Sequence, residues 1–162
     1  LIAMLESLAV IWVTVKVPRF GIMVVQKKWS ELDRLYFRTM ISSISIFAVV
    51  SLLLWGGVYG LNVINNPIID RIASPTIFGI FLGAAFFAQI ANCHAFYLRA
   101  HKKEPLLTLS IVFFLTNGFL VWFLGSQFAN MGISVAYLLT CGLLFCPFST
   151  VIFFRCRKKW HA

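Results

Sequence analysis

The sequence predicts an all-α membrane protein, a bundle of about five transmembrane helices. Three observations predict it. The 50 residues between Glu104 and Arg155 carry no charge, and two further uncharged runs, residues 39–69 and 72–98, hold 31 and 27 residues. A charged side chain at the centre of a bilayer costs about 2.5–3.5 kcal/mol, so a membrane favours such runs. Charged residues make up 12% of the chain, against about 25% in soluble domains.

Each predicted span follows from the length of its apolar run. A helix needs about 20 apolar residues to cross roughly 30 Å of hydrocarbon. The spans that we expect are residues 1–17, 40–62, 76–98, 106–124 and 133–154. Gly, Ser and Thr recur in them, which suits close packing between helices in lipid. We expect one membrane domain over residues 1–162, and, since the chain starts inside an apolar run, a piece of a longer protein.

The connections between the spans carry their own signals. Pro18 is expected to end the first helix, and Pro147 to kink the fifth by freeing the carbonyl of Leu143. Over residues 20–37, apolar and charged residues fall on opposite faces of a helix. This pattern predicts an amphipathic helix on the membrane surface. Residues 125–132, bracketed by glycines, are expected to form a short loop.

The basic residues predict an orientation. Of the 14 Lys and Arg residues, 13 fall in three clusters, at residues 16–38, 99–105 and 155–159. The alternate connections hold only Arg71. Loops rich in Lys and Arg stay in the cytoplasm. We therefore expect the three basic clusters and the C-terminus to be cytoplasmic.

Polar groups within the spans are the candidate functional residues. Glu6 lies ten residues before Lys16, near the middle of the membrane unless the true boundary of this span lies closer to it. In the third span Gln89, Asn92 and Arg99 fall on one face and form a polar stripe. The stripe indicates either a hydrated pathway for a polar substrate or hydrogen bonds between helices, which contribute about 0.6 kcal/mol on average.

Catalytic and metal-binding patterns are missing from the sequence. It contains no HExxH or GxSxG motif, no paired acidic cluster, and no CxxC pair among its four cysteines. The cysteines are most simply interpreted as small apolar side chains. We therefore expect no enzymatic activity, no metal and no cofactor.

Several connecting segments resemble those of a known family. These are the segments Pro18-Arg19-Phe20-Gly21, Leu32-Asp33-Arg34-Leu35-Tyr36-Phe37-Arg38 and Tyr97-Leu98-Arg99-Ala100-His101-Lys102-Lys103-Glu104-Pro105, with Gly125, Gly132 and Tyr137 after them. Together they resemble the C-terminal part of bacterial polysaccharide biosynthesis membrane proteins. That family comprises the Wzx-type O-antigen flippases of the MOP (multidrug/oligosaccharidyl-lipid/polysaccharide) superfamily.

The resemblance implies a transporter of the bacterial inner membrane that moves lipid-linked oligosaccharides. Its substrate would be a polyprenyl-pyrophosphate-linked oligosaccharide. Arg19 and Arg99 would attract the pyrophosphate, Gln89 and Asn92 would line the path of the polar head, and Glu6 would couple transport to an ion gradient. Such transporters work with two lobes, so we expect this chain not to transport without the missing N-terminal lobe. The alternatives are a multidrug or other permease, or a non-transporting scaffold for polysaccharide assembly.

Overall fold

The structure, a computed structural model, describes residues 2–64 and 74–161. These residues form helices and no strand, which confirms the all-α prediction. The elements, in chain order, are α1 (Ile2–Thr14), α2 (Val17–Val25), α3 (Trp29–Val63), α4 (Pro75–Ala100), α5 (Leu107–Leu139), the π-helix η2 (Thr140–Phe145) and α6 (Cys146–His161).

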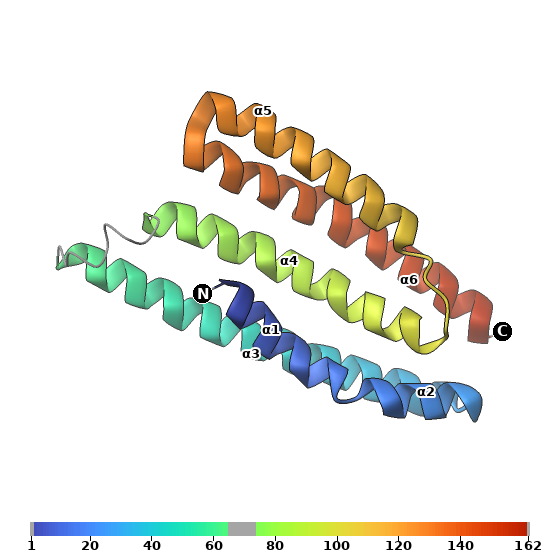
Figure 1. Ribbon diagram of the computed structural model, residues 1–162. Helices are drawn as coiled ribbons and strands as arrows, with labels where there is room; N and C mark the ends of the chain where they lie inside the picture. Colours follow the sequence, from blue (N-terminus) through green and yellow to red (C-terminus); the bar gives the residue numbers. More distant parts are fainter. Residues whose placement is uncertain (1, 65–73, 162) are drawn as a thin grey trace.

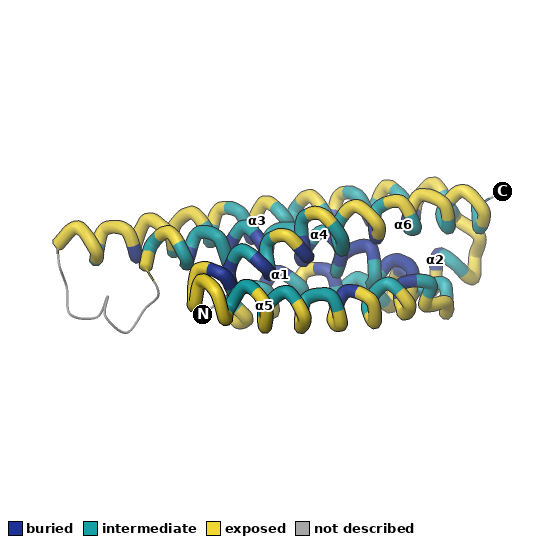
Figure 2. The backbone as a smooth tube through the Cα atoms, turned by 90° about the horizontal axis from the view of Figure 1, so that it is seen from above, coloured by how far each residue is buried: buried dark blue, intermediate teal, exposed yellow. Residues whose placement is uncertain are grey.

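Four helical stretches in the described residues are long and apolar enough to cross a membrane. They are Ile2–Val25, Trp29–Val63, Pro75–Ala100 and Leu107–His161. Their outward faces carry large apolar side chains, such as Leu53, Leu115 and Trp122, that are 70–71% exposed. Figure 2 shows this exposed surface around a narrow buried interior. A surface of this kind fits lipid and not water, as in a multi-pass membrane protein.

The last stretch, Leu107–His161, is a helical hairpin. Ala129 has φ 47° and ψ −132°, and the chain reverses there. The side chains of Asn117 and Thr140 are hydrogen-bonded, and the rings of Phe113 and Phe145 stack at 4.6 Å, so the two arms are antiparallel. With the hairpin counted as two arms, the four stretches of the described residues make five passes along the bundle. The predicted connection at residues 125–132 does contain this reversal, but it is not an extended loop, because all of it except Ala129 is helical.

Gly132 is what allows the two arms to meet so closely. A Cβ atom at this position would lie against the backbone carbonyl of Leu124, inside van der Waals contact. Gly125 faces the other arm too, where an added Cβ would be 3.1 Å from Ile133. Glycines at a crossing of two helices let the backbones approach without side chains between them.

The first pass differs from its prediction. Helix α1 ends at Thr14, and after Val15 and Lys16 the chain continues as α2 in nearly the same direction (Figure 1). Pro18 lies in the first turn of α2 and does not end α1, so that prediction was wrong. The first turn of a helix tolerates proline, because its N–H groups have no partner within the helix.

The predicted surface helix over residues 20–37 was also wrong. The chain turns at Gln26–Lys28, and Lys27 adopts a φ of 54°. Phe20, before the turn, and Leu32 and Tyr36, after it, are fully buried. They pack against α4 and α6 in the largest core cluster, so they face protein rather than a membrane surface. The apolar residues that suggested a surface helix thus form contacts within the core of the protein.

Helix α4 is the centre of the bundle. It contacts α1, α2, α3, α5, η2 and α6 (Figure 1), and its buried side chains include Ala84, Ala85, Gln89 and Tyr97. The predicted span at residues 76–98 agrees with its bounds. We call the end of the bundle that holds the α2–α3 turn, the α4–α5 link and the C-terminal part of α6 the basic end.

Pro147 coincides with a local change of helix type. The turn just before it, Thr140–Phe145, is π-helical, and the backbone N–H of Cys146 donates to the carbonyl of Cys141, five residues back. Proline has no N–H, so a helix commonly widens or bends one turn before it. The structure therefore shows a π-helical turn next to Pro147, where the sequence predicted a kink, and α6 continues past it to His161.

Candidate functional site

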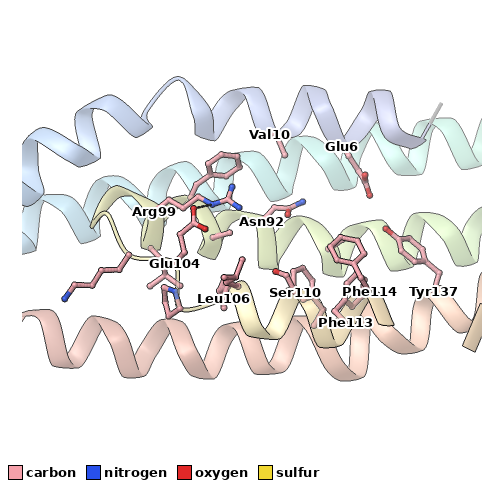
Figure 3. A pocket seen from close by; sticks show the side chains of 18 residues that line it. Glu6, Val10, Asn92, Arg99, Glu104, Leu106, Ser110, Phe113, Phe114 and Tyr137 are labelled. Carbon is pink, nitrogen blue, oxygen red and sulfur yellow. Dashed lines mark ion pairs between the residues drawn. The ribbon is translucent and has the colours of Figure 1, made fainter. Parts of the chain in front are cut away.

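A cleft of about 490 Å³ lies between α1 and the α5 hairpin, with α4 behind it (Figure 3). Its apolar lining includes Val10, Phe113 and Phe114, and its polar lining includes Glu6, Asn92, Ser110 and Arg99. The volume is within the range of about 300–1,000 Å³ that is common for ligand sites. Helix α1 and the first arm of α5 do not pack closely against each other here. The space between them stays open, and polar side chains of α4 line it.

Glu6 and Tyr137 mark the end of the cleft away from the basic end. Glu6 projects from α1 and is half-buried, and Tyr137 projects from the second arm of the hairpin. In Figure 3 the carboxylate and the phenol hydroxyl point toward one another. A carboxylate within a membrane bundle usually faces a cavity or a partner, and Glu6 does face this cavity.

Arg99 and Glu104 lie at the other end of the cleft, at the basic end. The Arg99 Nε atom is 3.6 Å from Glu104 Oε1, and the two side chains are 57% and 60% exposed. Exposed pairs of this kind contribute about 0–1 kcal/mol. The guanidinium is therefore held loosely and can exchange its partner for another anion. Lys103 adds a second cation to the same rim.

Three of the five residues that the sequence singled out share this cleft. Glu6, Asn92 and Arg99 line it together, although they come from α1 and α4. Gln89 does not line it, because its side chain is 1% exposed and its amide Nε2 donates to Ser43 Oγ at 2.9 Å. The Ser43 hydroxyl in turn donates to the carbonyl of Ala9 at 2.7 Å. Gln89 thus links α4 to α3 and α1, as the structural interpretation of the stripe expected.

Arg19 is also apart from the cleft. It lies on an exposed face of α2, near the basic end.

The spacing of residues along α4 could place Asn92 and Arg99 on one face, but it carried no information on which neighbouring helix that face would contact. Ser110, Glu104 and Tyr137 complete the cleft, and their contribution depends on the hairpin packing beside α4.

A second polar cluster at the basic end was missed by the sequence interpretation. Asp33 Oδ2 accepts hydrogen bonds from Arg157 Nη2 at 2.7 Å and Nε at 2.9 Å, and Asp33 Oδ1 accepts one from the Tyr97 hydroxyl at 2.8 Å. His161 Nε2 lies 3.0 Å from the same hydroxyl. The cluster joins α3, α4 and α6, and its members are up to 128 residues apart in the sequence. No local pattern marks such a pairing.

Aromatic and imidazole rings surround this cluster. The Trp29 and His161 rings stack at 4.6 Å, and the His101 and Trp160 rings are 4.7 Å apart. His101 Nδ1 is 3.1 Å from the carbonyl of Tyr97, and burial lowers the pKa of His101 below its ordinary value of 6.5. A neutral imidazole that donates from Nδ1 fits this setting. The cluster therefore holds the C-terminal part of α6 against α3 and α4.

A buried histidine forms a smaller network deeper in the bundle. His94 Nδ1 lies 2.6 Å from the Tyr36 hydroxyl, and its Nε2 lies 3.2 Å from Thr150 Oγ1. The ring also stacks on Phe153 at 4.6 Å. Both ring nitrogens have partners, so this histidine ties α4 to α3 and α6. Within residues 2–64 and 74–161 no three His, Cys, Asp or Glu side chains gather as a metal site would require.

The arrangement of the cleft suits an amphipathic ligand. Cations at its rim can bind an anionic head, the Asn92 amide and the Ser110 hydroxyl can accept and donate hydrogen bonds at its middle, and the apolar walls exclude water from between them. Searches of protein-family models, curated proteins and solved structures return no match to this chain.

Proposed function

We propose that this chain is part of a flippase that moves polyprenyl-pyrophosphate-linked oligosaccharides across the bacterial inner membrane. One observation carries the proposal: the cleft between α1 and the α5 hairpin places a half-buried carboxylate, an amide and a guanidinium along one path, which runs from the basic end to about the middle of α4. A polar head cannot cross hydrocarbon without such a path, because unpaired polar groups cost several kcal/mol each.

The substrate class follows from the charges on the path. Arg99 and Lys103 lie at the basic end, and Arg99 is held only by the exposed carboxylate of Glu104. A pyrophosphate offers a guanidinium two oxygens at once, which makes a stronger pair than a single exposed carboxylate. The polyprenyl chain would remain in lipid beside the apolar faces of α1 and α5. Alternating access requires a second bundle, which would form the other wall of the path.

The proposal includes an orientation with the basic end in the cytoplasm. A cysteine introduced at Asn130, in the hairpin turn, is expected to react with a membrane-impermeant maleimide added to intact cells. Cysteines at Lys103 or Lys159, both exposed at the basic end, are expected to react only after the membrane is permeabilised. Labelling of Lys103→Cys in intact cells would reverse the orientation, and with it the side from which the cleft takes its substrate.

Arg99→Ala is expected to weaken binding of the lipid-linked oligosaccharide about tenfold, because a charge-assisted contact of about 1.4 kcal/mol is lost. Arg99→Lys is expected to keep part of the affinity, since the charge remains and the planar fork does not. The measurement is binding to the purified natural protein in lipid nanodiscs, together with surface polysaccharide output in cells. Arg155→Ala, an exposed cation outside the cleft, is the matched control. Equal affinity of Arg99→Ala and wild type would remove Arg99 from the substrate path.

Glu6→Gln is expected to impair export and to leave folding unchanged, because the amide keeps the shape of the side chain and loses its ability to bind a proton or Na⁺. Export by wild type is expected to change with pH or with Na⁺, and export by Glu6→Gln to be insensitive to both. Glu31→Gln, which alters an exposed carboxylate outside the cleft, is the control. Identical pH and Na⁺ profiles for Glu6→Gln and wild type would exclude a coupling role for Glu6.

The same binding measurement separates the alternatives. A multidrug permease would bind lipophilic cations at the Glu6 carboxylate. Its binding would be weakened by Glu6→Gln and not by Arg99→Ala. A non-transporting scaffold for polysaccharide assembly would bind neither ligand in the cleft, and Glu6→Gln and Arg99→Ala would both leave polysaccharide output unchanged.

A further inference from the structure

A second cavity, of about 560 Å³, lies at the basic end between α2 and the C-terminal end of α4. It is distinct from the cleft, and the two share no residue. Its lining comes from α2 on one side and from Ala100, His101 and Lys102 on the other. The side formed by α2 is apolar. The polar lining residues follow the helix ends, Gln26 after α2 ends at Val25 and His101 and Lys102 after α4 ends at Ala100, and we call this the polar end of the cavity.

The apolar wall is open to the outside of the bundle. Ile22 and Val25 are 58% and 79% exposed, so the surrounding medium covers much of their surface. A Cβ atom added at Gly21 would meet no other atom within 4 Å. The apolar outward face of α2 therefore borders an open groove. In a bilayer, acyl chains fill a groove of this kind.

The polar end carries a cation in an unusual backbone position. Lys102 follows the last turn of α4 with a φ of 54°, and Lys27 follows α2 with the same φ. The backbone N–H of Lys28 donates to the carbonyl of Met23, and that of Lys27 to Val24, which is the hydrogen-bond pattern of a helix end normally closed by glycine. Lysine is strained in this conformation where glycine is not. A charge is therefore present at both helix ends where a glycine would suit the backbone better.

We propose that this cavity binds one anionic glycerophospholipid of the leaflet at the basic end. Its phosphate pairs with the Lys102 ammonium and accepts a hydrogen bond from the Gln26 side-chain amide, and one acyl chain lies along Gly21, Ile22 and Val25. Basic pockets between transmembrane helices bind lipid head groups in this way.

Charge complementarity selects the anionic lipid. Besides Lys102 itself, Arg19 and Lys27 are sequence neighbours of the lining residues Pro18 and Gln26. The nearest acidic residue in the α4–α5 link, Glu104, faces Arg99 at 3.6 Å. A single Lys or Arg near an anionic surface already strengthens binding several-fold, so this group of cations discriminates against zwitterionic lipids. This inference is independent of the flippase proposal, since it concerns neither the cleft nor its substrate.

The test is native mass spectrometry of the natural protein in detergent, titrated with phosphatidylglycerol or with phosphatidylcholine. We expect one phosphatidylglycerol to bind at least fivefold more tightly than phosphatidylcholine. Lys102→Gln is expected to abolish that preference, and Lys102→Arg to preserve it. Lys158→Gln removes an exposed charge from α6 and is the control for general electrostatic attraction.

A second variant tests the groove itself. Gly21→Leu places a side chain in the space that the acyl chain would occupy, and is expected to prevent binding of the first lipid while leaving the unfolding temperature near that of wild type. Gly118→Leu is matched to it, because that glycine also has open space around it and lies on α5, away from the cavity.

Three outcomes would overturn the proposal. One is equal binding of the two lipids to wild type, and another is a preference that survives Lys102→Gln. In the third, millimolar inorganic phosphate displaces the lipid and Gly21→Leu has no effect, in which case the site binds anions and not a phospholipid.

Discussion

Gly132→Ala is expected to disrupt the α5 hairpin and to give the largest loss of stability among the substitutions considered. The added Cβ would lie against the carbonyl of Leu124, which belongs to the backbone of the facing arm and cannot rotate away. Overpacking a core costs about 1–3 kcal/mol where side chains can adjust, so a clash with rigid backbone falls at or above the upper limit. We expect a clear drop in unfolding temperature in detergent and a new proteolytic site near Ala129.

Gly118→Ala is the matched control for this prediction. Gly118 is in the same helix, and a Cβ there would meet nothing within 4 Å. Alanine is favoured over glycine in a helix interior by up to about 1 kcal/mol, so this variant should be neutral or slightly more stable. If Gly132→Ala unfolds at the same temperature as Gly118→Ala, the two arms do not approach at residues 124 and 132 as described.

Asp33→Asn is expected to loosen the basic end by about 2–3 kcal/mol. The Asp33 carboxylate, 15% exposed, accepts two hydrogen bonds from the Arg157 guanidinium and one from the Tyr97 hydroxyl. Removing its charge leaves a partly buried guanidinium without a counter-ion, and hydrogen bonds to charged groups contribute about 1.5–3 kcal/mol. The measurement is the unfolding temperature, together with faster hydrogen exchange in the C-terminal part of α6.

The control for Asp33 is its neighbour Glu31, whose side chain is exposed two residues earlier on α3. Glu31→Gln is expected to change stability by less than about 0.5 kcal/mol, as surface substitutions usually do. In a double-mutant cycle, Asp33→Asn and Arg157→Gln should couple strongly, because each removes the partner of the other. Additive losses from the two substitutions would show that the pair does not hold α6 in place.

The number and approximate position of the passes were predictable because a bilayer imposes its rule locally. Each stretch of about 20 uncharged residues satisfies that rule by itself, whatever it packs against. Residues 76–98 therefore agree with α4, and the end of the predicted span at residue 62 is one residue from the end of α3. The rule says little about where helices begin outside the hydrocarbon. Helix α3 starts at Trp29, eleven residues before the predicted span, because its first turns pack against α2 and α4 instead of lipid.

The candidate site was predictable only in part, for a similar reason. Helical spacing placed Asn92 and Arg99 on one face of α4, and an isolated carboxylate drew attention to Glu6. Spacing could not distinguish Asn92, which faces the cleft, from Gln89, which is hydrogen-bonded to Ser43. That difference depends on which helix lies against each side of α4.

Composition and charge alone thus determined that the chain is helical and built for a membrane, because burying a charge in hydrocarbon is costly wherever it occurs in the sequence. The tertiary structure alone decided the Asp33–Arg157 pair, the burial of Gln89 against Ser43 and the joining of Glu6 to Arg99 in one cleft. Each of these depends on groups far apart in the chain meeting at a few ångströms, and such contacts leave no periodic trace in the sequence.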